Sequence, residues 1–302
     1  MEKQTENFTE LWQYVEKHKP QIENALREYQ PLAPAKIETK FNEAARYALF
    51  SGGKRLRPVL TLLGAELVGG KPESIVPAAC AVEFVHTSSL IFDDLPCMDN
   101  AVERRGKTSL HEKYGEGLAV LVAIGFLNAS YNLVFVNHAG IPERAIEAHS
   151  EIVKCVGAAG MVGGQSVDLA LAKGAPASDF SSKDYEFESI RNLKTSALMR
   201  LALRVGAILA GANQFELAHL SRFAKLLGDA YQLSDDLIDL EEDVEIFQSN
   251  RFFAAGKGQI AAQLKLKTII EEAKEVLIEN FPSNQARCCL IELTDYLAER
   301  KN

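Results

Sequence analysis

The sequence predicts an all-α protein, one large helical bundle with a single domain over residues 1–302. Apolar residues recur at spacings of three and four, as at Phe8, Leu11 and Val15, and this period places them on one face of a helix. We find no convincing run of strand-like alternation between turn residues. Glycine and proline interrupt the pattern so as to leave helices of about 10 to 25 residues, which is typical of a bundle. These interruptions fall at residues 31–36, 52–53, 69–70, 140–142 and 173–178.

Composition and charge limit what the chain can bind. Its 302 residues are 47% apolar and carry a net charge of −8, which favours an ample core and argues against a nucleic-acid binder. An anionic ligand must therefore meet a local basic cluster. The five cysteines form no CxxC pair, and the first residues lack an apolar stretch, so we expect a cytoplasmic protein with reduced thiols. The longest apolar run, 118–127, is about half a membrane span, so we do not expect an integral membrane protein.

The stretch 51–58, SGGKRLRP, joins two expected helices through a basic loop. Its glycines, including Gly53, suit the left-handed end of one helix, and Pro58 suits the first position of the next. Lys54, Arg55 and Arg57 then lie beside a helix N-terminus, where unpaired N–H groups and the helix dipole favour an anion. This loop is a candidate diphosphate site, and the alternative is a basic surface loop.

Three aspartates are crowded into residues 93–99, DDLPCMD. Pro96 should end the helix that carries Asp93 and Asp94, and Asp99 must then return by a turn. Converging carboxylates repel each other unless a cation lies between them, and a ligand set made only of oxygen suits Mg²⁺. The sequence therefore indicates a metal site here.

Basic and hydroxyl residues accompany this acidic stretch. Arg104 and Arg105 follow it directly and offer fixed positive charge to an anionic, metal-bridged ligand; the alternative is a set of carboxylate–arginine salt bridges. His86 lies two helical turns before Asp93 on the same face, although a lone histidine there is more often packed in a core. Lys194 and Thr195 form another basic and hydroxyl pair, which by itself is a weak signal.

A second acidic cluster occupies residues 231–243, YQLSDDLIDLEED. Asp235 and Asp239 are one helical turn apart, and Asp236 lies beside them. Carboxylates at this spacing share a helix face and repel unless a cation or a basic partner neutralises them. The alternative is a solvated acidic face, but the apolar flanks predict a largely buried helix, in which unpaired carboxylates would be costly.

Taken in order, six motifs resemble those of the trans-isoprenyl diphosphate synthases, the short-chain polyprenyl synthetases of the farnesyl and geranylgeranyl type. They span about 200 residues, and so many motifs in the right order make a chance similarity negligible. The resemblance implies the isoprenoid synthase fold, an all-α bundle around a deep central apolar cavity, commonly as a homodimer. The motifs are GGKRLRP, His86, DDLPCMDN with RRGK, GGQSVDL, LKTSAL and YQLSDDLID.

The resemblance also implies a reaction and its residues. The enzyme would condense isopentenyl diphosphate with an allylic diphosphate, namely dimethylallyl, geranyl or farnesyl diphosphate, using about three Mg²⁺ ions. No nucleophilic side chain would take part. The implied metal ligands are Asp93, Asp94, Asp99, Asp235 and Asp239, with Asp236 in the same catalytic group. Arg104, Lys194, Thr195 and Gln232 would contact the allylic headgroup, and Gly53, Lys54, Arg57, His86 and Arg105 would hold isopentenyl diphosphate.

Product length follows from helix geometry, because one turn rises about 5.4 Å, on the order of one isoprene unit. The tail would run from Asp93 back along its helix, past Ser88 and Ser89. In farnesyl-type relatives the position of Ser88 tends to be aromatic and acts as a floor. A serine leaves room for a longer chain, and Phe84, one turn further, could be a deeper floor. We therefore expect geranylgeranyl diphosphate (C20), with farnesyl diphosphate (C15) as the alternative.

The sequence also departs from the family pattern. Ala101 and Val102 stand where relatives usually have two more acidic residues, and relatives usually carry an aspartate near the position of Ile124. After Asp243, where relatives have a Gly-Lys segment and then a lysine, this chain is shorter and has Arg251 as the only nearby cation before Lys257. These departures leave open a catalytically weak regulatory subunit of the same fold. A Mg²⁺-dependent terpenoid cyclase would also use a DDxxD motif, but it would not need the second basic site around Lys54, Arg57 and His86.

Overall fold

The structure, a computed structural model, describes residues 8–37, 39–138, 140–174, 193–246 and 257–299; within them, only the backbone is described for 193–195, 239–246 and 257–258. The predicted all-α class is confirmed, with one two-stranded hairpin as an addition. The helices are α1 (Thr9–Tyr29), α2 (Phe41–Leu49), α3 (Leu56–Leu67), α4 (Pro72–Asp94), α5 (Leu110–Tyr114), α6 (Glu116–Leu133), α7 (Pro142–Val156), α8 (Met161–Ala172), α10 (Leu193–Ala210), α11 (Gln214–Ile246), α12 (Lys257–Asn280) and α13 (Gln285–Glu299), and the strands are β1 (Glu103–Arg104) and β2 (Lys107–Thr108).

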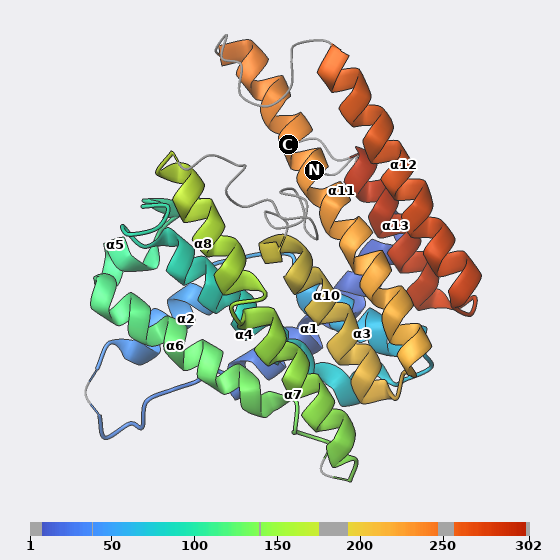
Figure 1. The fold of residues 1–302 in the computed structure, drawn as a ribbon. Helices are drawn as coiled ribbons and strands as arrows, with labels where there is room; N and C mark the ends of the chain where they lie inside the picture. The colour runs from blue at the N-terminus through green and yellow to red at the C-terminus, as the bar shows by residue number, and fades with distance from the viewer. Residues whose placement is uncertain (1–7, 38, 139, 175–192, 247–256, 300–302) are drawn as a thin grey trace.

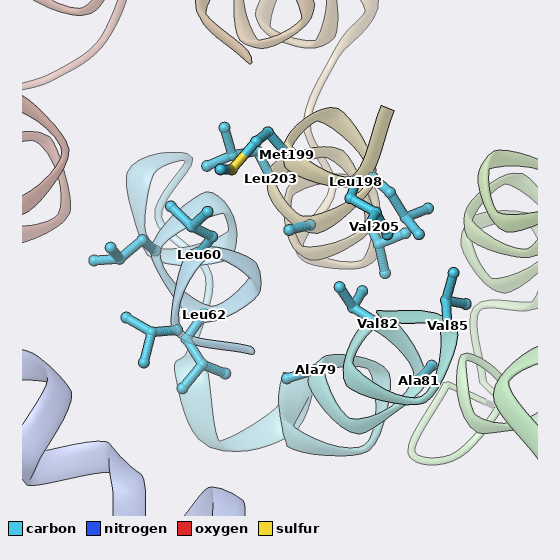
Figure 2. Close-up of a cluster of buried hydrophobic side chains, with 14 of the residues drawn as sticks. Leu60, Leu62, Ala79, Ala81, Val82, Val85, Leu198, Met199, Leu203 and Val205 are labelled. Atoms are coloured by element: carbon cyan, nitrogen blue, oxygen red, sulfur yellow. The ribbon is translucent and has the colours of Figure 1, made fainter. Parts of the chain in front are cut away.

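Three helices form the centre of the bundle. Helix α10 packs on α3, α3 packs on α4, and α4 packs on α6. Around them, α5 to α8 lie on one side and α11, α12 and α13 on the other (Figure 1). Figure 2 shows the buried side chains that join the centre, with Val82 of α4 pointing toward Val205 of α10 and Leu60 of α3 on the other side of the cluster, nearer Leu203 of α10. These residues are fully buried, so α4 runs through the hydrophobic core.

Two glycines allow α3 and α10 to approach closely. A Cβ at Gly206 would lie 1.9 Å from the carbonyl oxygen of Thr61, and one at Gly64 would lie 2.2 Å from that of Leu203. Both distances are far shorter than a carbon–oxygen contact allows, so neither position accepts a side chain without separating the helices.

Helix ends fall close to the predicted punctuation. Helix α4 ends at Asp94, and Leu95 before Pro96 is extended at ψ 151°, as the residue before a proline prefers. Helix α3 begins at Leu56, so Pro58 is its third residue rather than its first. The reason is Arg55, which takes the left-handed conformation at φ 54° and starts the helix two residues earlier than expected.

In the described part of the chain, three helical stretches are long and apolar enough to cross a membrane by length and composition: α4, α6 and Pro142–Ala172. In the most apolar 18-residue stretch of α4, 83% of the residues are buried inside the protein, whereas in α6 only 33% are buried. Leu121 and Ile124 of α6 and Ile146 of α7 are at least half exposed. Helix α6 is thus apolar on the side that faces away from the core as well as on the side that faces it.

The close contact of α3 and α10 gives a testable prediction. We expect Gly206→Ala to lower the free energy of unfolding by about 1–3 kcal/mol, because the new methyl group overpacks the helix crossing. Urea denaturation measures the change. Gly117→Ala is the matched control, since a Cβ there meets nothing within 4 Å, and it should leave stability unchanged or raise it by up to about 1 kcal/mol. Equal effects of the two variants would contradict the close-contact explanation.

Candidate active site

The first aspartate cluster lies at the C-terminal end of α4. Asp93 and Asp94 are 7% and 4% exposed, whereas Asp99 is exposed. The N–H of Asp99 donates to the carbonyl oxygen of Asp93 at 2.9 Å, so the chain turns back over the end of the helix. The carboxyl end of a helix carries partial negative charge, and two buried carboxylates there require positive charge nearby.

Arg104 supplies part of that charge through the β1–β2 hairpin. The two turn residues, Arg105 and Gly106, have φ of 55° and 70°, as a two-residue type I′ turn requires. The Nε and Nη2 atoms of Arg104 donate to Oδ1 of Asp94 at 2.8 and 2.5 Å. This hydrogen bond, with the nearby aspartate charge, raises the pKa of Arg104. Arg104 therefore lies beside the predicted metal ligands.

A separate basic cluster surrounds His86. Nη1 of Arg57 and Nη2 of Arg105 lie 3.1 and 3.4 Å from Nε2 of His86. Arginine can only donate, so Nε2 is the acceptor and the imidazole proton is on Nδ1. Burial, and then the positive charge of Arg57 and Arg105, hold the pKa of His86 well below its ordinary value. The histidine is thus a neutral acceptor between two cations, and the cluster keeps its positive charge.

The loop 51–53, which contains Gly52 and Gly53, packs against the guanidinium of Arg105. Nη1 of Arg105 donates to the carbonyl oxygen of Gly52 at 2.9 Å. A Cβ at Gly53 would lie 2.7 Å from that same nitrogen, and Gly53 has φ of 120°. Gly53 is therefore needed both for its conformation and for the space that Arg105 occupies.

Arg55 does not belong to the anion site that we expected. Its guanidinium is 2% exposed and donates at 2.7 Å to Glu23 of α1, to Glu83 of α4 and to the carbonyl oxygen of Leu49. These partners satisfy its charge inside the protein. The sequence did not predict the role of Glu83, because a single glutamate in an apolar helix gives no indication of the residue with which it pairs.

The second aspartate cluster lies in α11. Gln232, Asp235 and Asp236 are half-buried rather than deeply buried as predicted, and Tyr231 is close enough to Arg57 to influence its pKa. The side chain of Asp239 lies outside the described residues, as do those of Lys194 and Thr195 at the start of α10. Residues 247–256, part of the segment after Asp243 that differs from the family pattern, also lie outside them.

Several buried polar atoms at this site lack hydrogen-bond partners. Among the described side chains they include Nε of Arg57, Nδ1 of His86 and Oε1 of Gln232. Buried polar groups are nearly always paired. These three atoms, of the seven such atoms among the described side chains, belong to predicted substrate-binding residues and are available to a polar ligand.

An apolar pocket of about 320 Å³ opens beside Asp93. Ser88 and Ser89 line it, as predicted from helix geometry. Phe84 is not among the described lining residues; it is fully buried, and its ring packs 5.2 Å from that of Phe126. The α4 residue that lines the pocket at this depth is Val85 instead. The lining consists of Val85, Ser88, Ser89, Phe92, Asp93, Met98, Leu127, Val156, Met161, Val162, Gln165, Ser166 and Leu169.

The sequence predicted only part of the pocket lining that comes from α8 and from the turn after α4. Gln165, Ser166 and Leu169 come from the GGQSVDL motif, whereas the part that Met98 and Met161 play was missed. Nε2 of Gln165 lies 3.9 Å from Sδ of Met98. Methionine is common in cores and adapts to irregular spaces, so its residue type does not distinguish Met161 from an ordinary packing residue. Met98 lies within the DDLPCMDN motif, but it was given no role there.

The donor set fits Mg²⁺ in its chemistry. Within the described part of the chain, no group of three or more His, Cys, Asp or Glu is arranged to hold a metal ion. Mg²⁺ does not need such a cage, because it commonly keeps several waters and binds one or two carboxylates together with substrate phosphates. Asp93, which lines the apolar pocket, and Asp94, which lines the small cavity beside Arg104, are both buried and could provide those carboxylates.

The neutral state of His86 predicts a pH dependence of stability. The unfolded histidine takes up a proton near pH 6.5, while the folded one does so only at lower pH. The stability is therefore fully present above about pH 6.5 and should fall by up to about 1.4 kcal/mol per pH unit below it. In His86→Gln this component should be absent.

Urea denaturation of both proteins at pH 7.5 and pH 5.5 measures this component. His18, whose pKa burial also lowers, is present in both proteins, so their difference isolates His86. An unchanged pH dependence in His86→Gln would show that His86 takes up its proton at the same pH in the folded and the unfolded protein.

Comparison with known proteins agrees with this geometry. The polyprenyl synthetase family model matches residues 38–275. Geranylgeranyl pyrophosphate synthase 3, chloroplastic, of Arabidopsis thaliana is 38% identical over 89% of this chain and 76% of its own. The heterodimeric geranylgeranyl pyrophosphate synthase large subunit 1, chloroplastic, of the same plant is 36% identical over 89% and 74%. The crystal structure of an FPP/GFPP synthase from Zymomonas mobilis covers 94% of this chain and 99% of its own, with a TM-score of 0.76 and 28% identity. The chain belongs to the polyprenyl synthetase family.

Proposed function

We propose that the protein is a trans-prenyltransferase that condenses isopentenyl diphosphate with an allylic diphosphate, with geranylgeranyl diphosphate (C20) as its main product. The observation that carries the proposal is the presence of two different anion sites around α4. One pairs Asp93 and Asp94 with Arg104, and the other is purely basic, with Arg57 and Arg105 around neutral His86. Arg104, Arg105 and Asp94 also line one small cavity, so the two sites are neighbours.

Each site suits one substrate. Arg104, at the metal-binding aspartates, would hold the diphosphate of the allylic substrate, whose tail lies in the pocket beside Ser88 and Ser89. Arg57 and Arg105 would hold the diphosphate of isopentenyl diphosphate without a metal. A terpenoid cyclase has a single diphosphate substrate and would leave the second site without a ligand. The two sites therefore favour a prenyltransferase over a cyclase.

The reaction then depends on positioning and charge. The allylic C–O bond breaks, and its electron pair leaves with the diphosphate toward Arg104. The double bond of isopentenyl diphosphate forms the new C–C bond to the allylic carbon, and a proton is lost to the released diphosphate. The apolar wall that includes Phe92, Leu127 and Met161 excludes water, which would otherwise capture the cation.

Magnesium is part of the proposal. Bound at Asp93, Asp94 and, from the resemblance, Asp99, Asp235 and Asp239, about three Mg²⁺ ions would supply the positive charge that stabilises the leaving diphosphate. Two of these carboxylates are buried and adjacent to Arg104, which supports this assignment. The extension of the family domain to the whole of residues 1–302 is likewise our proposal.

We also propose a homodimer in the cytoplasm. The exposed apolar face of α6 and α7, with Leu121, Ile124 and Ile146, supports pairing with a second copy, because a face of this kind is usually covered. One relative is the large subunit of a heterodimeric geranylgeranyl pyrophosphate synthase, which supports association of this chain with a second subunit. All five cysteines are free thiols, which supports a reducing compartment. Light scattering of the purified protein would test the dimer.

Incubation of the purified protein with Mg²⁺, labelled isopentenyl diphosphate and each allylic primer tests the proposed activity. We expect a C20 product. In Asp93→Ala the rate should fall by at least about 10²–10³-fold, because buried electrostatic stabilisation is lost. Glu73→Ala, an exposed acid in the first turn of the same helix, is the control and should retain full activity.

The absence of product with every primer would contradict the prenyltransferase and favour the regulatory subunit. An active Asp93→Ala would show that this carboxylate is not needed for the metal.

The pocket makes a separate prediction about product length. Ser88→Phe places a ring in the space beside the tail, so the dominant product should change from C20 to C15. Ser88→Ala, which keeps the side chain small, should leave the product at C20. Chromatography of the dephosphorylated products measures the change. A C20 product from Ser88→Phe would show that the tail takes another route.

A further inference from the structure

Lys54 is held by aromatic residues from the two terminal helices. Its Nζ lies 5.0 Å from the ring centroid of Trp12 in α1 and 5.3 Å from that of Tyr296 in α13. The same nitrogen donates to the hydroxyl of Tyr296 at 3.0 Å. An ammonium group within about 6 Å of an aromatic face is attracted by the ring, so three separate interactions fix one side chain.

The two rings are themselves fixed. Tyr296 meets Trp12 edge to face at 5.4 Å and Phe8 at 5.7 Å. Trp12 and Tyr296 are partly buried and pack against the core, while Lys54 is exposed. The rings therefore form a rigid support, and the lysine is the group that is held on it.

The backbone of Lys54 is tied to the basic cluster. Gly53, directly before it, stands against the guanidinium of Arg105, and Arg55, directly after it, is locked into the core by Glu83 and Glu23. The backbone at Lys54 is therefore restrained, and the remaining conformational freedom is mainly that of its side chain. A free lysine side chain loses rotamer entropy when it is fixed by a ligand.

We propose that Trp12 and Tyr296 are positioning residues that hold the ammonium of Lys54 ready for the diphosphate of isopentenyl diphosphate. The inference rests on the proposed function and extends it to the terminal helices, which lie outside residues 38–275 that match the family model. Fixing the side chain beforehand lowers the entropic cost of binding. Neither aromatic residue touches substrate in this scheme.

Steady-state kinetics of Tyr296→Leu and Trp12→Leu test the proposal. In each, we expect KM for isopentenyl diphosphate to rise about three- to tenfold, on the order of the loss of one cation–π contact. The value of kcat and KM for the allylic primer should stay unchanged. Tyr296→Phe keeps the ring and removes only the hydrogen bond, so it should show a smaller rise and guards against misfolding as the cause.

The chain offers a matched control. Nζ of Lys113 lies 5.4 Å from the ring of Tyr114, almost the distance found for Lys54 and Tyr296, but on α5. Tyr114→Leu removes an equivalent ring contact and should leave KM for isopentenyl diphosphate unchanged. An equal rise in this control would mean that general destabilisation is responsible, and it would overturn the proposal.

A double-mutant cycle separates positioning from other effects. In a Lys54→Met background, Tyr296→Leu should cause no further rise in KM, because the group that it positions is gone. A further rise of the same size, or a fall in KM in the single variant, would overturn the proposal.

Binding of inorganic pyrophosphate without divalent cations, measured by calorimetry, gives a readout that does not need turnover. Tyr296→Leu should weaken it about three- to tenfold, and unchanged binding would count against the proposal. If the wild-type protein makes no prenyl product, the proposed function fails. If it is active and Tyr296→Leu behaves as wild type, only the present inference fails.

Discussion

The site depends on one buried ion pair, between Arg55 and Glu83. Arg55 connects the loop 51–57 to α4 and, through Glu23, to α1, with hydrogen bonds of 2.7 Å to both acids. Removing one partner of such a pair commonly costs about 3–5 kcal/mol, because the other charge stays buried. The pair also keeps Arg55 in a left-handed conformation that is rare for a side chain of its size. That conformation sends Lys54 toward the terminal helices and Arg57 toward His86.

The site gathers positive charge locally, although the chain as a whole carries a net negative charge. The protein carries a net charge of −8, yet Arg57, Arg105 and Arg104 gather within reach of α4. Neutral His86 allows two of these guanidinium groups to approach one nitrogen without adding a third charge. Asp93 and Asp94 at the end of α4, and Asp235 and Asp236 within α11, carry the opposite charge. A metal and two diphosphates would fit between them with less repulsion than either cluster suffers alone.

The sequence predicts features that depend on neighbours along the chain. Helical periodicity gives the bundle, Pro96 gives the end of α4, and the spacing of the aspartates gives the fold-back of Asp99. Contacts between distant segments were not predictable in this way. Arg55 meets Glu83 and Glu23, which are 28 and 32 residues away, and nothing local distinguishes it from Lys54 or Arg57. The rotation of α4 was similarly unknown, and one residue corresponds to a large turn around the axis. That is why Val85 lines the pocket and Phe84 packs in the core.

Helix α4 carries both residues proposed to bind substrate and residues that line the apolar pocket, because different faces of the helix contact different parts of the site. His86 points to the basic cluster, Asp94 to Arg104, and Ser88 and Ser89 to the apolar pocket. From Asp93 to Val85 the helix rises roughly 12 Å, so the diphosphate and the end of the tail are measured along one rigid element. The buried contacts with α3, α6 and α10 keep that element from moving. In the proposed reaction, a change of side chain at a single turn of α4 would therefore alter the length of the product while the reacting end stays in place.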